Sequence, residues 1–151
     1  MARVYLKGLP QLKAKLVRLK EQTAAEVAPA MGRAAQVVVD MMKRQVPVDH
    51  GDLRDSIGWT FGEKPKYAQA VTSVRSGTTR VTIFAGNAKV RYAHLVEFGT
   101  KPHPQGGLYA GTMHPGTRPQ PFFFSSWRAT RNEARKIIRQ AVRDAVRKAV
   151  T

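Results

Sequence analysis

The chain has no cysteine among its 151 residues, so neither disulfide bonds nor thiolate zinc sites hold it together. Long apolar runs are also missing, since no stretch approaches the roughly 18 apolar residues of a membrane-spanning helix. The first seven residues lack the apolar core of a secretory signal peptide. We therefore expect a protein that is made in a reducing cytoplasm, is not exported by that route and does not enter a membrane.

Acidic residues are scarce. Ten Asp and Glu oppose 26 Lys and Arg, which gives a formal net charge of +16 and a pI near 11.0. This excess is far larger than solubility requires. It predicts a polyanion or an acidic protein surface as a neighbour, and charge alone does not separate these two, because both attract a basic face in a salt-dependent way.

Motifs for catalysis and for sequence-specific nucleic-acid reading are missing as well. The chain has no glycine-rich phosphate loop, no paired catalytic carboxylates and no Ser/His/Asp arrangement. Its histidines are dispersed, without close paired ligands, at His50, His94, His103 and His114. Neither zinc-finger spacing nor an aromatic RNA-binding strand occurs. We expect no enzymatic activity, no cofactor and no metal.

The first third of the chain predicts two helices after a short strand at 3–6. Leucines recur at helical spacing in the first helix, at Leu9, Leu12, Leu16 and Leu19. Thr23 and Glu26 then form a capping-box pattern, which predicts the start of a second helix that continues to Gln45. Pro29 fits the first turn of that helix, and Pro47 fixes its end.

A turn and a small sheet are predicted next. In the turn, Asp52 is expected to cap the following amides with Asp55 at the capping-box position, and Leu53 and Ile57 to share one apolar face. Strands are predicted near 56–61, 67–75 and 79–85, because β-branched and aromatic residues alternate there. Ser76-Gly77 is the expected hairpin turn, and Val81, Ile83 and Ala85 are expected to point inward.

The stretch 92–100 carries an isolated negative charge. Glu97 is the only acidic residue between Glu63 and Glu133 in the sequence. The spacing of Tyr92, Leu95, Val96 and Gly99 predicts two helical turns that press the first three inward and end at Gly99. We expect Arg54 to neutralise Glu97, and a short buried connector with one structural ion pair is the simpler interpretation.

A long loop and a final helix complete the chain. Ten of the 23 residues in 99–121 are Gly or Pro, which predicts an exposed loop that is either an interface or mobile. A helix is predicted from Phe122 to about Val150, with Ser125 or Ser126 as its cap. Two apolar columns are expected to dock this helix on the sheet or on the long helix. A third column is basic, and it is either a solvated face or a binding face for DNA or an acidic partner: Arg131, Arg135, Arg139, Arg143 and Arg147.

These elements predict an α+β fold in a single domain spanning 1–151. It comprises a helical part at 1–46, a turn, a mainly antiparallel sheet and a short central helix at 47–98, a long loop at 99–121 and a C-terminal helix at 122–151 packed on the sheet.

Three motifs follow one another along the chain, at 46–57, 92–100 and 119–122. Together they resemble the neck, or head-tail joining, proteins of long-tailed bacteriophages and prophages, a family that includes tail-completion and minor tail proteins. The resemblance covers nearly the whole chain. His50, where Thr is usual, Asp52, where Asn is usual, and a longer loop after Gly99 depart from the family pattern. The matching residues are Pro47, Asp49, Gly51, Leu53, Arg54, Tyr92, Glu97, Phe98, Gly99, Pro121 and Phe122.

The resemblance implies a structural virion protein that forms a ring in the neck, where it joins the portal side of the head to the tail with the DNA path through it. The implied partners are copies of itself, with a hexamer as one option, head-completion or stopper proteins, tail-terminator or tail-tube proteins, and packaged DNA bound non-specifically. The alternative, suggested by charge alone, is a stand-alone non-specific DNA-binding protein. A nuclease would need clustered acidic metal ligands, which the sequence lacks.

Overall fold

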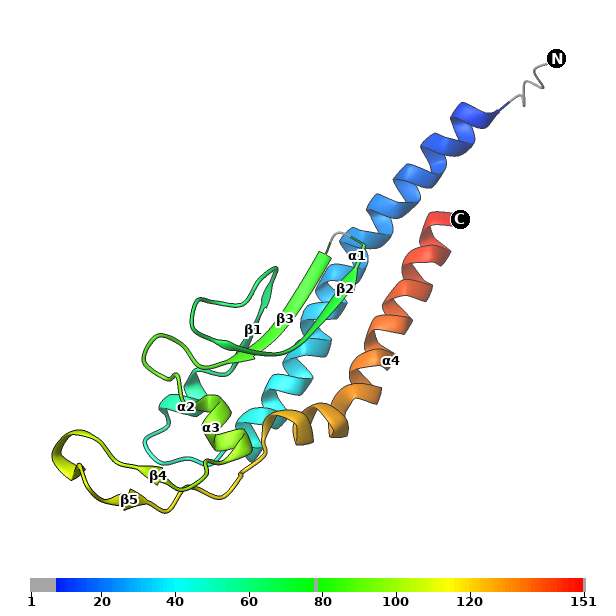
Figure 1. Ribbon diagram of the computed structural model, residues 1–151. Helices are drawn as coiled ribbons and strands as arrows, with labels where there is room; N and C mark the ends of the chain where they lie inside the picture. Colours follow the sequence, from blue (N-terminus) through cyan, green and yellow to red (C-terminus); the bar gives the residue numbers. More distant parts are fainter. Residues whose placement is uncertain (1–7, 78, 151) are drawn as a thin grey trace, which may run out of the picture.

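The computed structural model describes residues 8–77 and 79–150, so the predicted strand at 3–6 lies outside the described residues. The helices are α1 (Leu9–Gln45), α2 (Asp52–Asp55), α3 (Ala93–Phe98) and α4 (Phe123–Val150), with a 3-10 turn at Gly107–Tyr109. The strands are β1 (Gly58–Phe61), β2 (Gln69–Ser76), β3 (Thr79–Ala85), β4 (His103–Pro104) and β5 (Met113–His114). Figure 1 shows α1 as the long axis of the molecule, with the sheet and α4 both packed along it. None of the described helices is both long and apolar enough to span a membrane.

A single helix, α1, replaces the two helices predicted from the sequence. The predicted capping box is wrong, because the Thr23 hydroxyl donates a hydrogen bond of 2.6 Å to the Leu19 carbonyl one turn earlier. Pro29 lies inside the helix without ending it. An interior proline costs about 3 kcal/mol, and the buried residues that surround it on the core face offset this cost. They include Val27, Ala30, Met31 and Ala34.

The sheet is antiparallel, as predicted, and its strand order is β1-β3-β2. Its central strand has the predicted bounds, and Val81, Ile83 and Ala85 are buried in the core as expected. β1 begins two residues later than predicted, because Ser56 still belongs to the end of α2. There its hydroxyl donates to the Leu53 carbonyl and accepts a hydrogen bond from the amide of Gly86.

The turn before the sheet is built differently from the prediction. Gly51, and not Asp52, is the N-cap residue of α2, and its φ of 92° lies in the left-handed region that favours glycine. No side chain caps this helix. Leu53 and Ile57 are both buried, as predicted. The turn therefore keeps its apolar anchors and leaves the Asp52 side chain exposed.

α4 packs along α1, which corrects the prediction that it lies on the sheet. Its buried side is continuous with the core through Phe123 and Ala134, with Ile138 half-buried and Ala145 buried further along. The sheet and α4 thus lie side by side against α1 (Figure 1). Between them is a crevice of about 250 Å³, lined by Val38, Val74, Ile83, Trp127 and Ile138 among others. The small alanines let the two long helices approach closely.

Replacing Gly32 tests how tightly α1 packs on the sheet. A Cβ at this buried position would lie 2.8 Å from Cη2 of Trp59, whose ring is also held by a 2.8 Å hydrogen bond from Nε1 to Gln36. Gly32→Ala gains about 1 kcal/mol of helix propensity but loses about 1–3 kcal/mol to overpacking. We expect a net loss in urea unfolding. In a Trp59→Phe background the same change should become stabilising, and equal effects in both backgrounds would contradict this packing.

Candidate functional site

Glu97 caps the N-terminus of α4. Glu97 is 3% exposed, and its carboxylate accepts hydrogen bonds from three consecutive backbone amides. Oε2 accepts from the amides of Phe122 at 2.7 Å and Phe123 at 2.8 Å, and Oε1 accepts from Phe124 at 3.2 Å. These amides have no acceptor within their own helix, and the helix dipole favours a negative charge at this end. The carboxylate thereby supplies the hydrogen-bond acceptors that an N-cap side chain of α4 would supply.

The predicted ion pair between Glu97 and Arg54 is wrong. The Arg54 guanidinium is half-exposed and lies 3.6 Å from the carboxylate of Asp55 on its own short helix. The prediction assumed that an isolated carboxylate needs a cation, whereas aligned amides at a helix N-terminus satisfy it equally well. The expected caps are also wrong, because the Ser125 hydroxyl bonds the Pro121 carbonyl, and the hydroxyls of Ser125 and Ser126 both donate to Oε1 of Gln45.

One signal for this arrangement was present in the sequence. The first turn of α4 contains no acidic residue, so its amides require an acceptor from elsewhere. The role of Gln45 had no such signal, because a glutamine at the end of a helix has no characteristic spacing to its partner. Together these contacts join α1, α3 and α4 at one corner of the molecule.

α3 ends at Phe98 before Gly99, as predicted, but only Val96 of the three predicted inward-facing residues packs, half-buried, against the core. Ala93 and Glu97 point inward, whereas Tyr92 and Leu95 are 43% and 41% exposed. Capping α4 requires Glu97 to face the core, and this requirement rotates its neighbours outward. Gly99 has a φ of 70°, and a Cβ there would lie 2.5 Å from the Thr117 carbonyl, so this position requires glycine.

Residues 99–121 form an arm that is more regular than the predicted loop. Thr100 and Thr117 exchange two backbone hydrogen bonds at its base, and β4 pairs antiparallel with β5 further out. The tip carries exposed apolar side chains, with Leu108 99% exposed and Tyr109 66% exposed. Figure 1 shows the arm extending from the end of the molecule opposite the N-terminal part of α1.

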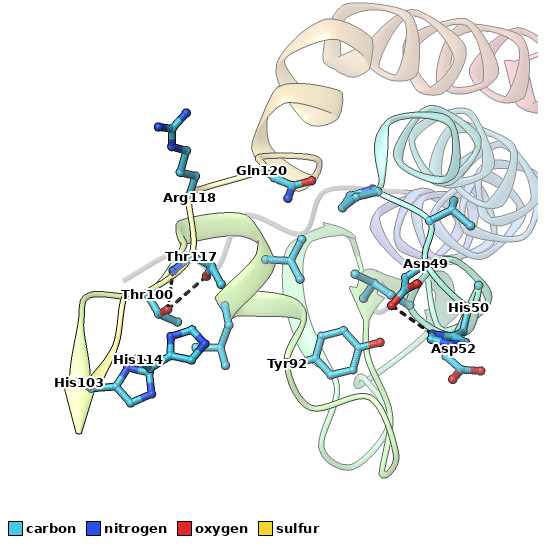
Figure 2. Close-up of a pocket in the computed structure, with 16 residues that line it drawn as sticks. Asp49, His50, Asp52, Tyr92, Thr100, His103, His114, Thr117, Arg118 and Gln120 are labelled. Carbon is cyan, nitrogen blue, oxygen red and sulfur yellow. Dashed lines mark hydrogen bonds and ion pairs between the residues drawn. The ribbon is translucent and has the colours of Figure 1, made fainter. Parts of the chain in front are cut away.

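A groove of about 560 Å³ lies between the base of the arm and the turn before α2. Its apolar lining includes Val48, Leu53, Tyr92, Leu95 and Val96. Asp49, His50 and Asp52 stand at one wall, with Asp49 and His50 3.1 Å apart. His103, His114, Thr100 and Thr117 form the other wall (Figure 2). Arg118 also borders the groove, but Figure 2 shows its side chain extending away from it.

The structure divides the predicted motif residues into two sets. Groove residues come from two motifs that are distant in sequence: Pro47, Asp49, Gly51, Leu53 and Tyr92. The cap joins Glu97 to Phe122, and Phe98 contacts Phe124 with ring centroids 6.1 Å apart. His103 and His114 stack at 5.0 Å, but no group of three or more metal-binding side chains occurs in the part of the chain that the structure describes.

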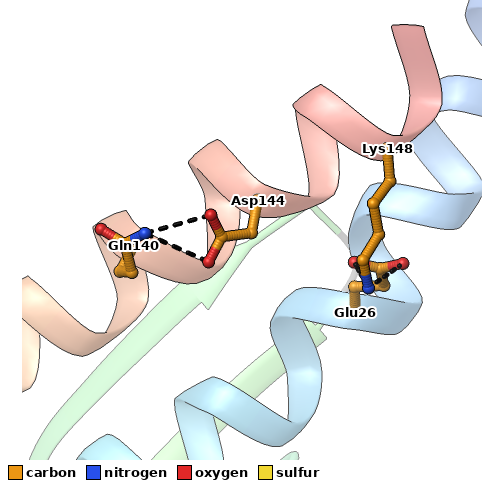
Figure 3. Close-up of polar contacts among 4 residues, drawn as sticks. All are labelled: Glu26, Gln140, Asp144 and Lys148. Carbon is orange, nitrogen blue, oxygen red and sulfur yellow. Dashed lines mark hydrogen bonds and ion pairs between the residues drawn. The ribbon is translucent and has the colours of Figure 1, made fainter. Parts of the chain in front are cut away.

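The predicted basic column lies on the exposed side of α4. All five of its arginines are exposed, namely Arg131, Arg135, Arg139, Arg143 and Arg147. Figure 3 shows contacts of two acidic residues near this column. Asp144 accepts hydrogen bonds from Gln140 at 3.0 and 3.2 Å, and Glu26 lies 3.2 Å from Lys148. Exposure is compatible with both predicted roles of the column, a solvated face and a binding face.

Substitution of Glu97 tests the cap. Glu97→Gln removes the charge and turns a donor toward the amides, so we expect a loss of about 2–3 kcal/mol in unfolding free energy. Glu133→Gln, at an exposed position on α4, should change stability by less than about 0.5 kcal/mol. Arg54→Gln should cost less than about 1 kcal/mol. Equal losses of stability for Glu97→Gln and Arg54→Gln would contradict the cap and support the ion pair between these two residues.

Comparison with known proteins identifies a family. Residues 11–99, more than half of the 151-residue chain, match the HK97-gp10-like family, described as "Bacteriophage HK97-gp10, putative tail-component". The matched region includes α1, the sheet and α3, and it ends at the base of the arm. No curated protein and no solved structure gives a significant match. The chain belongs to the HK97-gp10-like family of bacteriophage tail components.

Proposed function

We propose that this protein is a structural connector that assembles as a ring in the neck of a phage or prophage particle. It joins the portal side of the head to the tail and leaves the DNA path through its centre. The family match over 11–99 carries this proposal, since it relates the chain to tail components. The protein acts by presenting surfaces to its neighbours.

The distribution of uncovered surface supports assembly into a ring. A closed ring uses heterologous interfaces, so each subunit needs two different complementary surfaces. The groove and the arm lie at one end of the molecule, and the first turns of α1 extend beyond α4 at the other end (Figure 1). These separate surfaces suit contact with two different neighbours. The adjoining proteins in the neck are head-completion or stopper proteins on one side and tail-terminator or tail-tube proteins on the other.

A gene-disruption experiment tests this role. A stop codon early in the gene should leave filled heads and complete tails that accumulate separately, because the connector between them is missing. Adding purified protein to the mixture should restore joined particles. Normal numbers of joined particles in the mutant would contradict the proposal, and a defect in head filling or tail length with joining intact would assign the protein elsewhere.

The arginine face of α4 meets the DNA in the neck or an acidic surface of an adjoining ring. Successive members of the column are rotated by about 40° and rise about 6 Å, so they form a slanting band that fits an extended anion. The exposure of all five side chains supports this role. The same observation supports the alternative function, a stand-alone non-specific DNA-binding protein.

Neutralising part of this band separates the two functions. Changing Arg131, Arg139 and Arg143 to Gln should leave the fold intact but reduce head-tail joining or DNA retention, and it should weaken the salt dependence. Lys64→Gln, Arg75→Gln and Lys89→Gln together remove the same charge from other exposed positions and serve as the control. Joining that is unchanged at every salt concentration would make the band a solvated face. A monomer whose only defect is weaker duplex DNA binding would favour the alternative.

The arm should gain contacts on assembly. Its tip has local hydrogen bonds, such as that from the amide of Gln105 to Thr112, but Leu108 and Tyr109 are exposed, so apolar packing offsets little of its ordering entropy. We expect rapid hydrogen exchange of amides at 105–112 in the separated subunit and strong protection in the assembled ring. Strong protection in both states would instead show that the arm is stable by itself.

A further inference from the structure

The N-terminal half of α1 presents an apolar face that the rest of the described chain leaves uncovered. Leu12 and Leu16 are each 55% exposed, and Leu9 is 42% exposed. These leucines lie on the side of the helix that is buried further along, from Val27 onward. α4 ends beside this transition, where Lys148 contacts Glu26 (Figure 3). A face that packs in one half of a helix and is bare in the other indicates a missing partner.

Lysines border this face on both sides. At about 100° per residue, Lys13 and Lys20 fall on one side of the leucines and Lys15 on the other, while Arg18 points away. The segment is therefore an amphipathic helix with an apolar stripe and basic borders. Its complement is an apolar groove with an acidic wall.

The groove beside α2 has that character. Val48, Tyr92 and Leu95 offer exposed apolar surface, although side chains of this kind are normally buried. Asp49 and Asp52 stand on its wall with Asp55 nearby, so three of the ten acidic residues of a +16 chain gather within seven positions. The Asp49 side chain is 93% exposed and is available to a second molecule.

The helix and the groove of one chain cannot meet. Between Leu12 and Gln45 the helix rises by about 50 Å, and the groove lies just beyond its far end. Figure 1 shows these two regions at opposite ends of the molecule. The occupant of the groove must therefore come from another chain, and a second copy supplies the matching apolar stripe and basic borders.

We propose that the N-terminal half of α1 of one subunit docks in the groove of the next, with Leu12 and Leu16 against Tyr92 and Leu95. Lys13 and Lys20 then face Asp49 and Asp52. This helix-in-groove contact is heterologous, so it closes into a ring if the rotation between subunits allows. It deepens the proposed ring by naming its interface, and it rests on that proposal.

Cross-linking tests the contact without background, because the chain has no cysteine. Leu12→Cys and Leu95→Cys subunits are mixed and treated with a short bismaleimide. We expect a covalent dimer of one of each, several-fold more abundant than with Ala14→Cys, which lies at an exposed position on the other side of the helix. Light scattering on the same samples reports the oligomeric state.

The cross-linking outcomes separate the interface from the ring. If the protein forms oligomers but Leu12→Cys and Ala14→Cys cross-link equally well, this interface is wrong and the ring is not contradicted. The same holds if Leu12→Cys subunits cross-link to one another. A protein that stays monomeric at all concentrations without mixed cross-links would contradict the interface and the self-assembling ring together. Head-tail joining by the gene-disruption assay would still report separately on the role in the neck.

A charge exchange gives a second, independent readout. Asp49→Lys with Asp52→Lys should weaken self-association about tenfold or more, because like charges then oppose each other across the contact. Adding Lys13→Glu and Lys20→Glu to the same chain restores the net charge and should restore association. As a control, adding Arg18→Glu and Lys89→Glu instead restores the net charge without placing opposite charges across the proposed contact. Equal recovery with both pairs would overturn the proposed contact.

Discussion

The carboxylate of Glu97 on the first amides of α4 is the contact on which the rest of the structure depends. It is buried, and it satisfies three backbone donors that have no acceptor in their own helix. The same contact fixes the rotation of α3, because Glu97 cannot face α4 unless Tyr92 and Leu95 face outward. It also anchors the base of the arm, which leaves α3 at Gly99 and returns at Pro121. One side chain thus positions two of the surfaces that we assign to assembly.

Two sets of apolar side chains are exposed where a soluble monomer would bury them, and the Glu97 contact accounts for the first set. Tyr92 and Leu95 line a groove, and the leucines of α1 continue beyond the end of α4. Both features cost solubility in a separated subunit, and the large positive charge counteracts that cost by repulsion. The ring that we propose covers the same groups. Acidic residues are few on this chain, so the acidic turn is a distinctive target for the contact that we propose.

Residue types and spacing predicted the α+β class, the antiparallel sheet with its inward-facing central strand, and the bounds of α3. These features follow from local periodicity, which a single sequence contains. The continuous α1 was missed because the burial of residues around Pro29 outweighs its local preference, and burial depends on the distant α4. The partner of Glu97 was missed because it is a set of backbone amides, and no residue type marks such amides in a sequence. The docking of α4 on α1 was equally non-local, since its apolar columns fit either surface.

A reconstruction of the neck in intact particles tests the head-to-tail ring most directly. At a resolution that shows side chains, we expect a closed ring of this chain between head and tail. Each groove should hold the N-terminal half of α1 from the adjacent subunit, with Leu12 and Leu16 against Tyr92 and Leu95. Density for this chain outside the neck, or a ring in which each groove is empty or filled by a different protein, would contradict the account.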